Sequence, residues 1–348
     1  MKKYFLRANT SSGCISFADE NLHDMTVVAV KGKSKYAKTE FLKRVSSVLE
    51  KSGVECEWVM SPFDIKMLDA IILHSGNMAF VDGDITASCN RQGKTADATA
   101  DIDCAIGESD NALELFKKQD EALDMLYGAY REAKSIHDEW ESVYISETDY
   151  DRLGAYTSDL AEKLINSHGG GGKTVKRFFG ASTPDGSVNY INELTGNLKK
   201  RYFIKGRPGT GKSTFLKHLA NKAKCAGLDT EIYYCSFDKD SLDMVVVPEL
   251  GFCVFDSTAP HELFPERECD EIVDFYTESG LFGVDEKYSD KLNDIKNRYN
   301  FKTAQGRAYL RLANIFGEEA EYDYSKNIDY EYLYSLAERT AREALKKL

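Results

Sequence analysis

Apolar and polar positions follow the same order in two parts of the chain, and the second part shows that order more clearly. There, an apolar run at 201–206 predicts a short strand, and residues 213–226 have the spacing of an amphipathic helix that Gly227 would end. Residues 231–237 predict the next strand, and the apolar residues from 244 to 256 predict a third. Strand, loop, helix and strand in succession are typical of an α/β fold with a parallel sheet flanked by helices.

The last part of each half has a different pattern. Beyond about residue 284 the chain is rich in Lys, Glu and Tyr with helical spacing, so we expect a helical extension that forms a cap or an arm. Two apolar stripes with the same helical spacing end the two halves. They are Leu153, Tyr156, Leu160, Ala161 and Leu164, and then Leu333, Leu336, Thr340, Ala341 and Ala344.

These parallels indicate a duplication. Residues 4–20 align with residues 177–193 at a shift of 173, and residues 31–82 align with residues 205–256 at a shift of 174. About 13 of roughly 52 positions in the longer alignment are identical, which is well above what unrelated segments share. Near the ends of the two copies the shift is 180. The sequence therefore predicts two tandem copies of one domain.

The expected boundaries follow from the alignment. The first domain spans 1–166, the second spans 175–348, and the glycine-rich stretch 167–174 joins them as a flexible linker. The linker ends in Gly-Lys-Thr, as a phosphate-binding loop does. However, Ser167 stands where that motif needs a glycine, and a helical pattern precedes it instead of a strand, so the linker interpretation is favoured.

Charge and cysteine content exclude some classes of partner. The 348 residues include 45 basic and 57 acidic side chains, giving a net charge of -12. Because this charge repels phosphate backbones and anionic lipids, we expect neither a nucleic-acid partner nor a membrane partner. The eight cysteines show no CxxC spacing and lie mostly in apolar runs, which favours free thiols in a reducing, cytoplasmic compartment.

A phosphate-binding loop follows the first strand of the second copy. Residues 206–213 match GxxxxGK[ST] at every fixed position, and they lie between a predicted strand and a predicted helix. Glycines let backbone amides approach a phosphate, and the helix N-terminus adds its positive dipole end. The candidate nucleotide-binding residues are Gly206, Arg207, Pro208, Gly209, Thr210, Gly211, Lys212, Ser213 and Thr214.

Within this loop, Lys212 would contact the β- and γ-phosphates and Ser213 would offer a hydroxyl to Mg²⁺. Asp256 ends the third apolar strand, at the sheet edge where the loop is expected, and would hold the same Mg²⁺ through water. An aspartate at a strand end is also a common turn residue. The residue after Asp256 is Ser257, where motor-type ATPases place a water-activating glutamate, so only slow hydrolysis is expected.

Three further residues are candidates for catalysis or substrate binding. Asp238 and Asp243 follow a strand at the ligand edge and recur in the first copy as Asp64 and Asp69, although helix N-capping would explain them equally well. His261 lies just beyond Asp256 and could sense or protonate a phosphate, although a lone surface histidine usually does neither.

The arginines are weaker candidates for phosphate binding. Arg207 in the loop and Arg267 beyond it could touch phosphate, although solvated arginines are commoner. Arg298, Arg307 and Arg311 are spread along a helical stretch and do not form the clustered lid that would favour a kinase.

The quoted motifs carry a family resemblance. The duplicated layout resembles an uncharacterised bacterial family of tandem P-loop proteins, usually labelled ATPase or nucleotide kinase. The resemblance covers nearly the whole chain and depends on "GRPGTGKST" from Gly206, "SFDKDSLDMVVVPELG" from Ser236 and "FDSTAPHE" from Phe255. It implies a P-loop NTPase fold in both halves and ATP, more than GTP, as the ligand. It brings no established reaction.

The first copy departs from the pattern that the resemblance implies. In its loop, residues 32–39, Lys35 replaces the inner glycine and Ala37 replaces the glycine before the lysine, so side chains stand where the backbone should close on a phosphate. Lys38, Thr39 and Asp82 remain. We interpret this loop as a structural pseudo-site, with weak phosphate binding as the alternative.

Three functions remain open on these residues. The favoured one is a slow Mg·ATP-dependent ATPase or switch with the first copy as a regulatory partner. The second is a small-molecule or nucleotide kinase, in which Asp238 or Asp243 accepts the proton of an acceptor hydroxyl. The third is a nucleotide-binding scaffold whose helical extensions recruit another protein.

Overall fold

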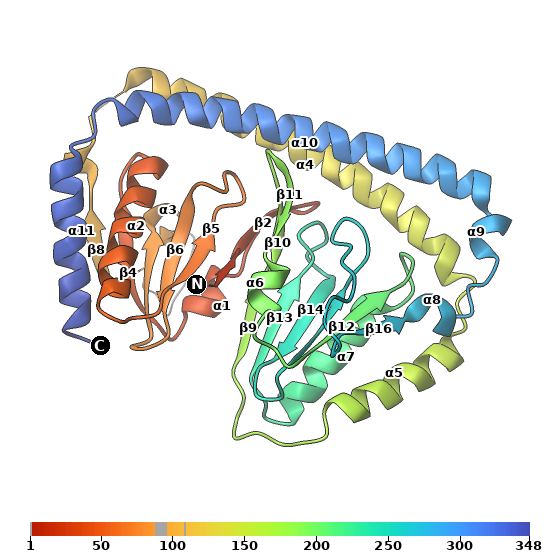
Figure 1. Ribbon diagram of the computed structural model, residues 1–348. Helices are drawn as coiled ribbons and strands as arrows, with labels where there is room; N and C mark the ends of the chain where they lie inside the picture. The colour runs from red at the N-terminus through yellow and green to blue at the C-terminus, as the bar shows by residue number, and fades with distance from the viewer. Residues whose placement is uncertain (1, 88–95, 108) are drawn as a thin grey trace.

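The computed structural model describes residues 2–87, 96–107 and 109–348, and it is an α/β structure with two six-stranded sheets (Figure 1). Helices flank both sheets, as the sequence predicts. Within the described residues, no helix combines the length and the apolar character needed to cross a bilayer. The described cysteines have free thiols, and Cys89 lies outside the described residues.

The first sheet is built from residues before 102, and its strands lie in a non-sequential order. That order is β1 (Lys3–Tyr4), β5 (Glu57–Met60), β6 (Leu68–Leu73), β7 (Met78–Asp82), β4 (Thr26–Lys31) and β8 (Ala98–Asp101). The helical segments of this part are α1 (Ala18–Leu22), α2 (Lys35–Lys51), α3 (Gly83–Ala87) and the short 3₁₀ turn Asp103–Ala105.

The second sheet repeats this order with the equivalent strands. They are β9 (Thr174–Arg177), β13 (Thr230–Tyr234), β14 (Leu242–Val247), β15 (Phe252–Asp256), β12 (Lys200–Lys205) and β16 (Glu271–Asp274). Its helices are α6 (Ile191–Thr195), α7 (Lys212–Cys225), α8 (Phe275–Glu278) and α9 (Val284–Lys287). The matching strand order agrees with the duplication seen in the sequence.

The expectation of a parallel sheet is wrong, because both sheets are mixed. In the second sheet β14 runs antiparallel to both β13 and β15, and in the first sheet β6 does the same between β5 and β7. The apolar stretch 244–256 is therefore two strands rather than one. The cause is the short connections at 235–241 and 248–251, because a parallel crossover needs about a dozen residues or more.

The two copies meet at a point of local symmetry. Phe5 and Phe178, which are equivalent in the repeat, each donate a backbone N–H to the other's carbonyl oxygen at 2.9 Å. Beside them lie two equivalent hairpins, β2 (Arg7–Thr10) with β3 (Gly13–Ser16), and β10 (Gly180–Thr183) with β11 (Gly186–Asn189). Buried side chains of both copies share one core at this junction.

The expected helical arms are present as two long helices. The first is α4 (Asp110–Ile145) and the second is α10 (Ser289–Ser325). They pack along each other and pass over both sheets (Figure 1). Leu126 and Tyr130 of α4 and Leu310 of α10 are buried together between them.

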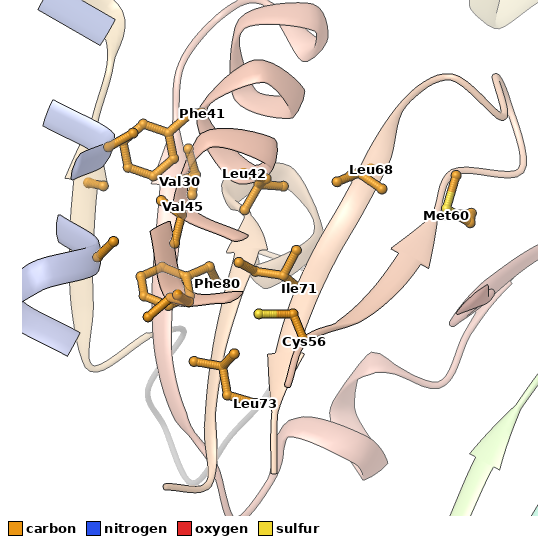
Figure 2. Close-up of a cluster of buried hydrophobic side chains, with 14 of the residues drawn as sticks. Val30, Phe41, Leu42, Val45, Cys56, Met60, Leu68, Ile71, Leu73 and Phe80 are labelled. Carbon is orange, nitrogen blue, oxygen red and sulfur yellow. The ribbon is translucent and has the colours of Figure 1, made fainter. Parts of the chain in front are cut away.

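The final helix of each copy packs against helices of the other copy. In the first copy this helix is α5 (Tyr150–Leu164), which joins the core around α7 of the second copy. In the second copy it is α11 (Tyr330–Leu345), which packs against α2. Leu333 of α11 is buried in the cluster of Phe41 and Phe80 shown in Figure 2. The two copies are thus interlocked through exchanged helices and paired arms.

Candidate functional site

The loop of the second copy has the backbone that its glycines allow. It connects β12 to α7, and Gly209 and Gly211 have φ angles of 76° and 75°. This left-handed region is accessible to glycine and strained for other residues. The Thr210 hydroxyl donates to the Arg207 carbonyl oxygen at 2.8 Å and closes the turn. Among the described residues, no carboxylate accepts a hydrogen bond from the amides of this loop.

Lys212 and Asp256 lie together at the loop. Asp256 ends β15, whose neighbour in the sheet is the parallel strand β12, and it stands opposite Ile204 in register. The Lys212 Nζ is 3.6 Å from an Asp256 carboxylate oxygen, and it donates to the Arg207 carbonyl oxygen at 2.8 Å. The lysine is nearly buried. The two residues that the motif assigned to one site are therefore neighbours.

Asp243 belongs to the same cluster. Because β14 runs antiparallel to β15, the first residues of β14 lie at the sheet edge where β15 ends. Burial and the neighbouring Asp256 carboxylate raise the pKa of Asp243 to about 8. Ser213 lies next to it, with its hydroxyl accepting a hydrogen bond from the Leu242 amide at 2.9 Å. Two carboxyl groups and a single lysine thus share this corner of the sheet.

This shifted pKa predicts a pH dependence of stability. The folded protein holds a proton on Asp243 that the unfolded chain releases near its usual pKa of 3.8. The free energy of unfolding should therefore fall as pH rises from 3.8 towards about 8. In urea titrations of nucleotide-free protein, the Asp243→Asn variant should lack this part of the pH dependence of the free energy of unfolding. A pH dependence identical in both proteins would contradict the prediction.

Asp238 is a turn residue at the rim of the cluster. Its carboxylate accepts from the Asp240 amide at 3.0 Å, and its carbonyl accepts from the Ser241 amide at 3.0 Å. It also pairs with Lys134 of α4 at 3.4 Å. Neither Asp238 nor Asp243 caps a helix, because the turn leads into β14. The N-capping alternative is therefore wrong for both residues.

His261 is a buried side chain rather than a surface one. Its ring packs edge-on to Phe179 at 5.0 Å between centroids, and its Nδ1 has no hydrogen-bond partner among the described residues. Burial lowers the pKa of His261 to about 4, although the nearby Asp256 acts in the opposite direction. This histidine is neutral at pH 7.

The candidate arginines are held by protein groups. Arg207 pairs with Asp285 and lies over the Tyr276 ring, with the guanidinium carbon 5.1 Å from the ring centroid. Arg267 pairs with Asp270 at 3.0 Å and donates to two backbone carbonyls. Thr214 is exposed on α7.

The first copy has extra positive charge at the equivalent positions. Lys35, which replaces Gly209, bridges two carboxylates with its Nζ 2.8 Å from Asp69 and 2.6 Å from Asp82. Lys38 lies 2.7 Å from Asp82. Burial alone would raise the pKa of Asp82, but Lys35 and Lys38 outweigh it and lower that pKa. The ammonium of Lys35 therefore neutralises the pair of carboxylates that correspond to Asp243 and Asp256.

A third cation in the first copy is Arg7, which the sequence interpretation did not include. Its guanidinium forms a bidentate ion pair with the Asp69 carboxylate, with both N–O distances at 2.8 Å. The equivalent residue in the second copy is Gly180, and among the described residues no arginine acts on the Asp243 carboxyl group. The available signal was this Arg-to-Gly difference between the aligned copies.

The amides of the first loop are also occupied. Glu321 of α10 accepts from the Lys35 amide at 2.7 Å, from the Tyr36 amide at 3.1 Å, and from the Ser34 hydroxyl at 2.5 Å. Amides at a helix N-terminus bind anions, so this carboxylate sits where the loop would bind a phosphate. The equivalent residue of the second copy's partner arm is Glu141, whose carboxylate lies instead 3.9 Å from His137.

The arm α4 lies directly on the second loop. A Cβ added at Gly209 would fall 2.7 Å from the Glu141 carbonyl oxygen and 3.0 Å from Ile145, both in the last part of α4. Leu153 of α5 is the neighbour of Gly211. Helices of the first copy therefore cover the loop of the second copy.

No family model, no curated protein and no solved structure matches this chain. The family resemblance drawn from the motifs accordingly rests on the sequence alone.

Proposed function

We propose that this chain is a Mg²⁺-dependent ATP-binding protein of the P-loop class that acts as a slow ATPase or nucleotide-dependent switch through the loop of the second copy. The observation that carries the proposal is a charge difference between equivalent sites. In the first copy, Arg7, Lys35 and Lys38 neutralise two buried carboxylates. In the second copy, the cation beside the two equivalent carboxyl groups is Lys212.

The residues at the second loop fit a divalent cation. Buried carboxylates are costly unless they are paired or coordinate a metal, and the raised pKa of Asp243 reflects that cost. Carboxylate and hydroxyl oxygens are the ligands that Mg²⁺ prefers. Asp256 and Ser213 would hold the ion, whose positive charge would favour the ionised form of the nearby Asp243 carboxyl group. When bound, Mg²⁺ would neutralise charge on the β- and γ-phosphates.

The loop itself is suited to phosphates. Among the described residues, no carboxylate accepts a hydrogen bond from its amides, whereas Glu321 accepts from those of the first loop. Lys212 bonds to a carbonyl within the loop, and its ammonium could exchange that partner for a phosphate oxygen. The choice of ATP over GTP in this proposal rests only on the family resemblance.

The first prediction from this proposal concerns stoichiometry. Isothermal titration with Mg·ATP should give one tight site per chain, and removing Mg²⁺ should weaken binding. Among the described residues, only the first loop has a carboxylate bound to its amides and three cations beside its two carboxylates. A Lys35→Gly and Ala37→Gly double variant should still show one site, since Glu321 and Arg7 remain in place. Two equally tight sites in the wild-type chain would contradict the proposal.

Slow turnover is the second prediction. Ser257 follows Asp256, and its hydroxyl is bonded to the Leu263 backbone, donating at 2.7 Å and accepting at 3.1 Å. It therefore offers no base to an attacking water. Phosphate release with ATP and Mg²⁺ alone should lie well below the enzyme median of ~10 per second. Turnover at or above that median would show that another group activates water.

A switch is supported by the position of α4. The end of this arm touches Gly209, and a bound phosphate would need the space close to that contact. Nucleotide binding would therefore favour a different position of the arm, and the arm runs the length of the molecule (Figure 1).

A further inference from the structure

A cavity of about 590 Å³ lies beside the first loop, between the first sheet and the two arms. Phe63 contributes from the connection between β5 and β6, Gln119 from α4, and Gly317 from α10. The cavity is separate from the loop of the second copy, which is at the other end of the arms (Figure 1).

The equivalent space in the second copy is filled by aromatic rings. Phe237, Tyr299 and His137 occupy the positions of Phe63, Gln119 and Gly317 in the repeat. The ring centroids of His137 and Tyr299 are 5.7 Å apart, and Phe237 lies 6.0 Å from Tyr299 and 6.3 Å from His137.

Two replacements therefore account for the opening. Gly317 removes the ring that His137 supplies, and Gln119 replaces the ring of Tyr299 with a side chain that turns to the Ala313 carbonyl at 3.2 Å. Unfilled cavities destabilise a protein in proportion to their volume. Side chains fill the equivalent space in the second copy, so the fold does not require a cavity here. An open cavity in the first copy therefore suggests a bound ligand.

The cavity's own charges indicate what that occupant is. Arg7 and Lys35 line it, but both are paired with Asp69 or Asp82, and Glu321 takes the loop amides. Few donors therefore remain for a phosphate. In total, five carboxylates and three cations line the cavity, so its net charge is negative.

The lining also includes five aromatic side chains, namely Tyr36, Phe63, Phe116, Tyr322 and Tyr330. Ring faces attract flat apolar groups and organic cations. Pockets of this size commonly enclose small ligands through an apolar lining and a few polar groups.

We propose that the cavity beside the first loop binds a small organic cation with an aromatic or apolar body. This site is independent of the nucleotide proposed for the second copy. The two copies would then bind different ligands. The second copy retains the phosphate loop, and aromatic rings fill its equivalent of the cavity. In the first copy, charged side chains occupy the loop and the cavity is open.

The test transplants the packing of the second copy into the first. A Gly317→His and Gln119→Tyr double variant should fill the cavity beside Phe63. Ligand-observed NMR would screen wild type and variant against aromatic fragments in equal numbers of cations, neutral compounds and anions. We expect saturable wild-type hits dominated by cations, with affinity at least about tenfold lower in the variant. A lack of hits, a majority of anions, or equal binding to the variant would overturn the proposal.

A single variant serves if the double variant fails to fold. Glu318 lines the cavity and is half exposed, so Glu318→Gln should preserve the fold. It should weaken the cationic hits several-fold and leave neutral hits unchanged. Equal affinities of cations for wild type and Glu318→Gln would count against the proposed charge recognition. Lys212→Ala should leave all hits unchanged, which separates this site from the nucleotide site.

Discussion

Replacing Lys212 with alanine is expected to lower the affinity for Mg·ATP on the order of 100-fold, because two charge-assisted contacts to phosphate oxygens would be lost. Lys212 is the cation that lies nearest Asp256, at 3.6 Å, and it begins α7 directly behind the two left-handed glycines. Isothermal titration would measure the change.

The duplication provides a matched control. Lys38 is the equivalent lysine of the first copy, and Asp82 retains its contact with Lys35 when Lys38 is replaced. Lys38→Met should therefore leave the nucleotide affinity unchanged, with thermal unfolding used to confirm that the variant is folded. Equal affinities of wild type and Lys212→Ala, or a large loss in Lys38→Met, would place the nucleotide elsewhere.

The elements of the fold were largely predictable because they are local. The helix after Gly206, its end at Gly227 and the long arms follow from apolar spacing and from glycine positions within a few turns of chain. The proximity of Lys212 and Asp256 was also predictable. Lys212 follows β12 and Asp256 ends β15, and these two strands are parallel neighbours that end at the same sheet edge, whatever the direction of β14.

The direction of β14 was missed because a continuous apolar run has no period that reveals a turn. Residues 242–247 and 251–255 are buried, and between them Pro248 and Glu249 are exposed and Leu250 is half-buried. Pro248 lacks an amide hydrogen, and Gly251 has a φ of 71°, so together they were the available turn signal.

The neutralising contacts in the first copy join residues far apart in the sequence. Glu321, on α10 of the second copy, and Lys35, in the first copy, are 286 residues apart in the sequence. Local patterns contain no information about such contacts. The comparison of the two loops shows Lys35 opposite Gly209, and extending it position by position would also have shown Arg7 opposite Gly180, so each adds a cation to one copy alone.

This asymmetry leads to the second large effect, in which the same substitution has opposite consequences in the two copies. Asp69→Asn is expected to reduce the free energy of unfolding by about 3–5 kcal/mol, because removing one partner of a buried ion pair leaves the other charge uncompensated. Arg7 loses both of its 2.8 Å contacts, and Lys35 retains only Asp82. Asp69 itself is 1% exposed, so water cannot replace the lost carboxylate.

Asp243→Asn makes the equivalent change where no arginine faces the carboxyl group. Here the substitution removes a buried acid whose ionised form is unfavourable, so the nucleotide-free variant should gain stability relative to wild type as pH rises above 3.8, and this gain should be almost complete by about pH 8. Urea unfolding of both variants at two pH values would compare them directly. Equal destabilisation by the two substitutions would show that the second cluster is neutralised by protein groups in the same way as the first. The carboxyl groups of Asp243 and Asp256 would then need no divalent cation to neutralise them. The assignment of the nucleotide site to the second copy would lose its main support.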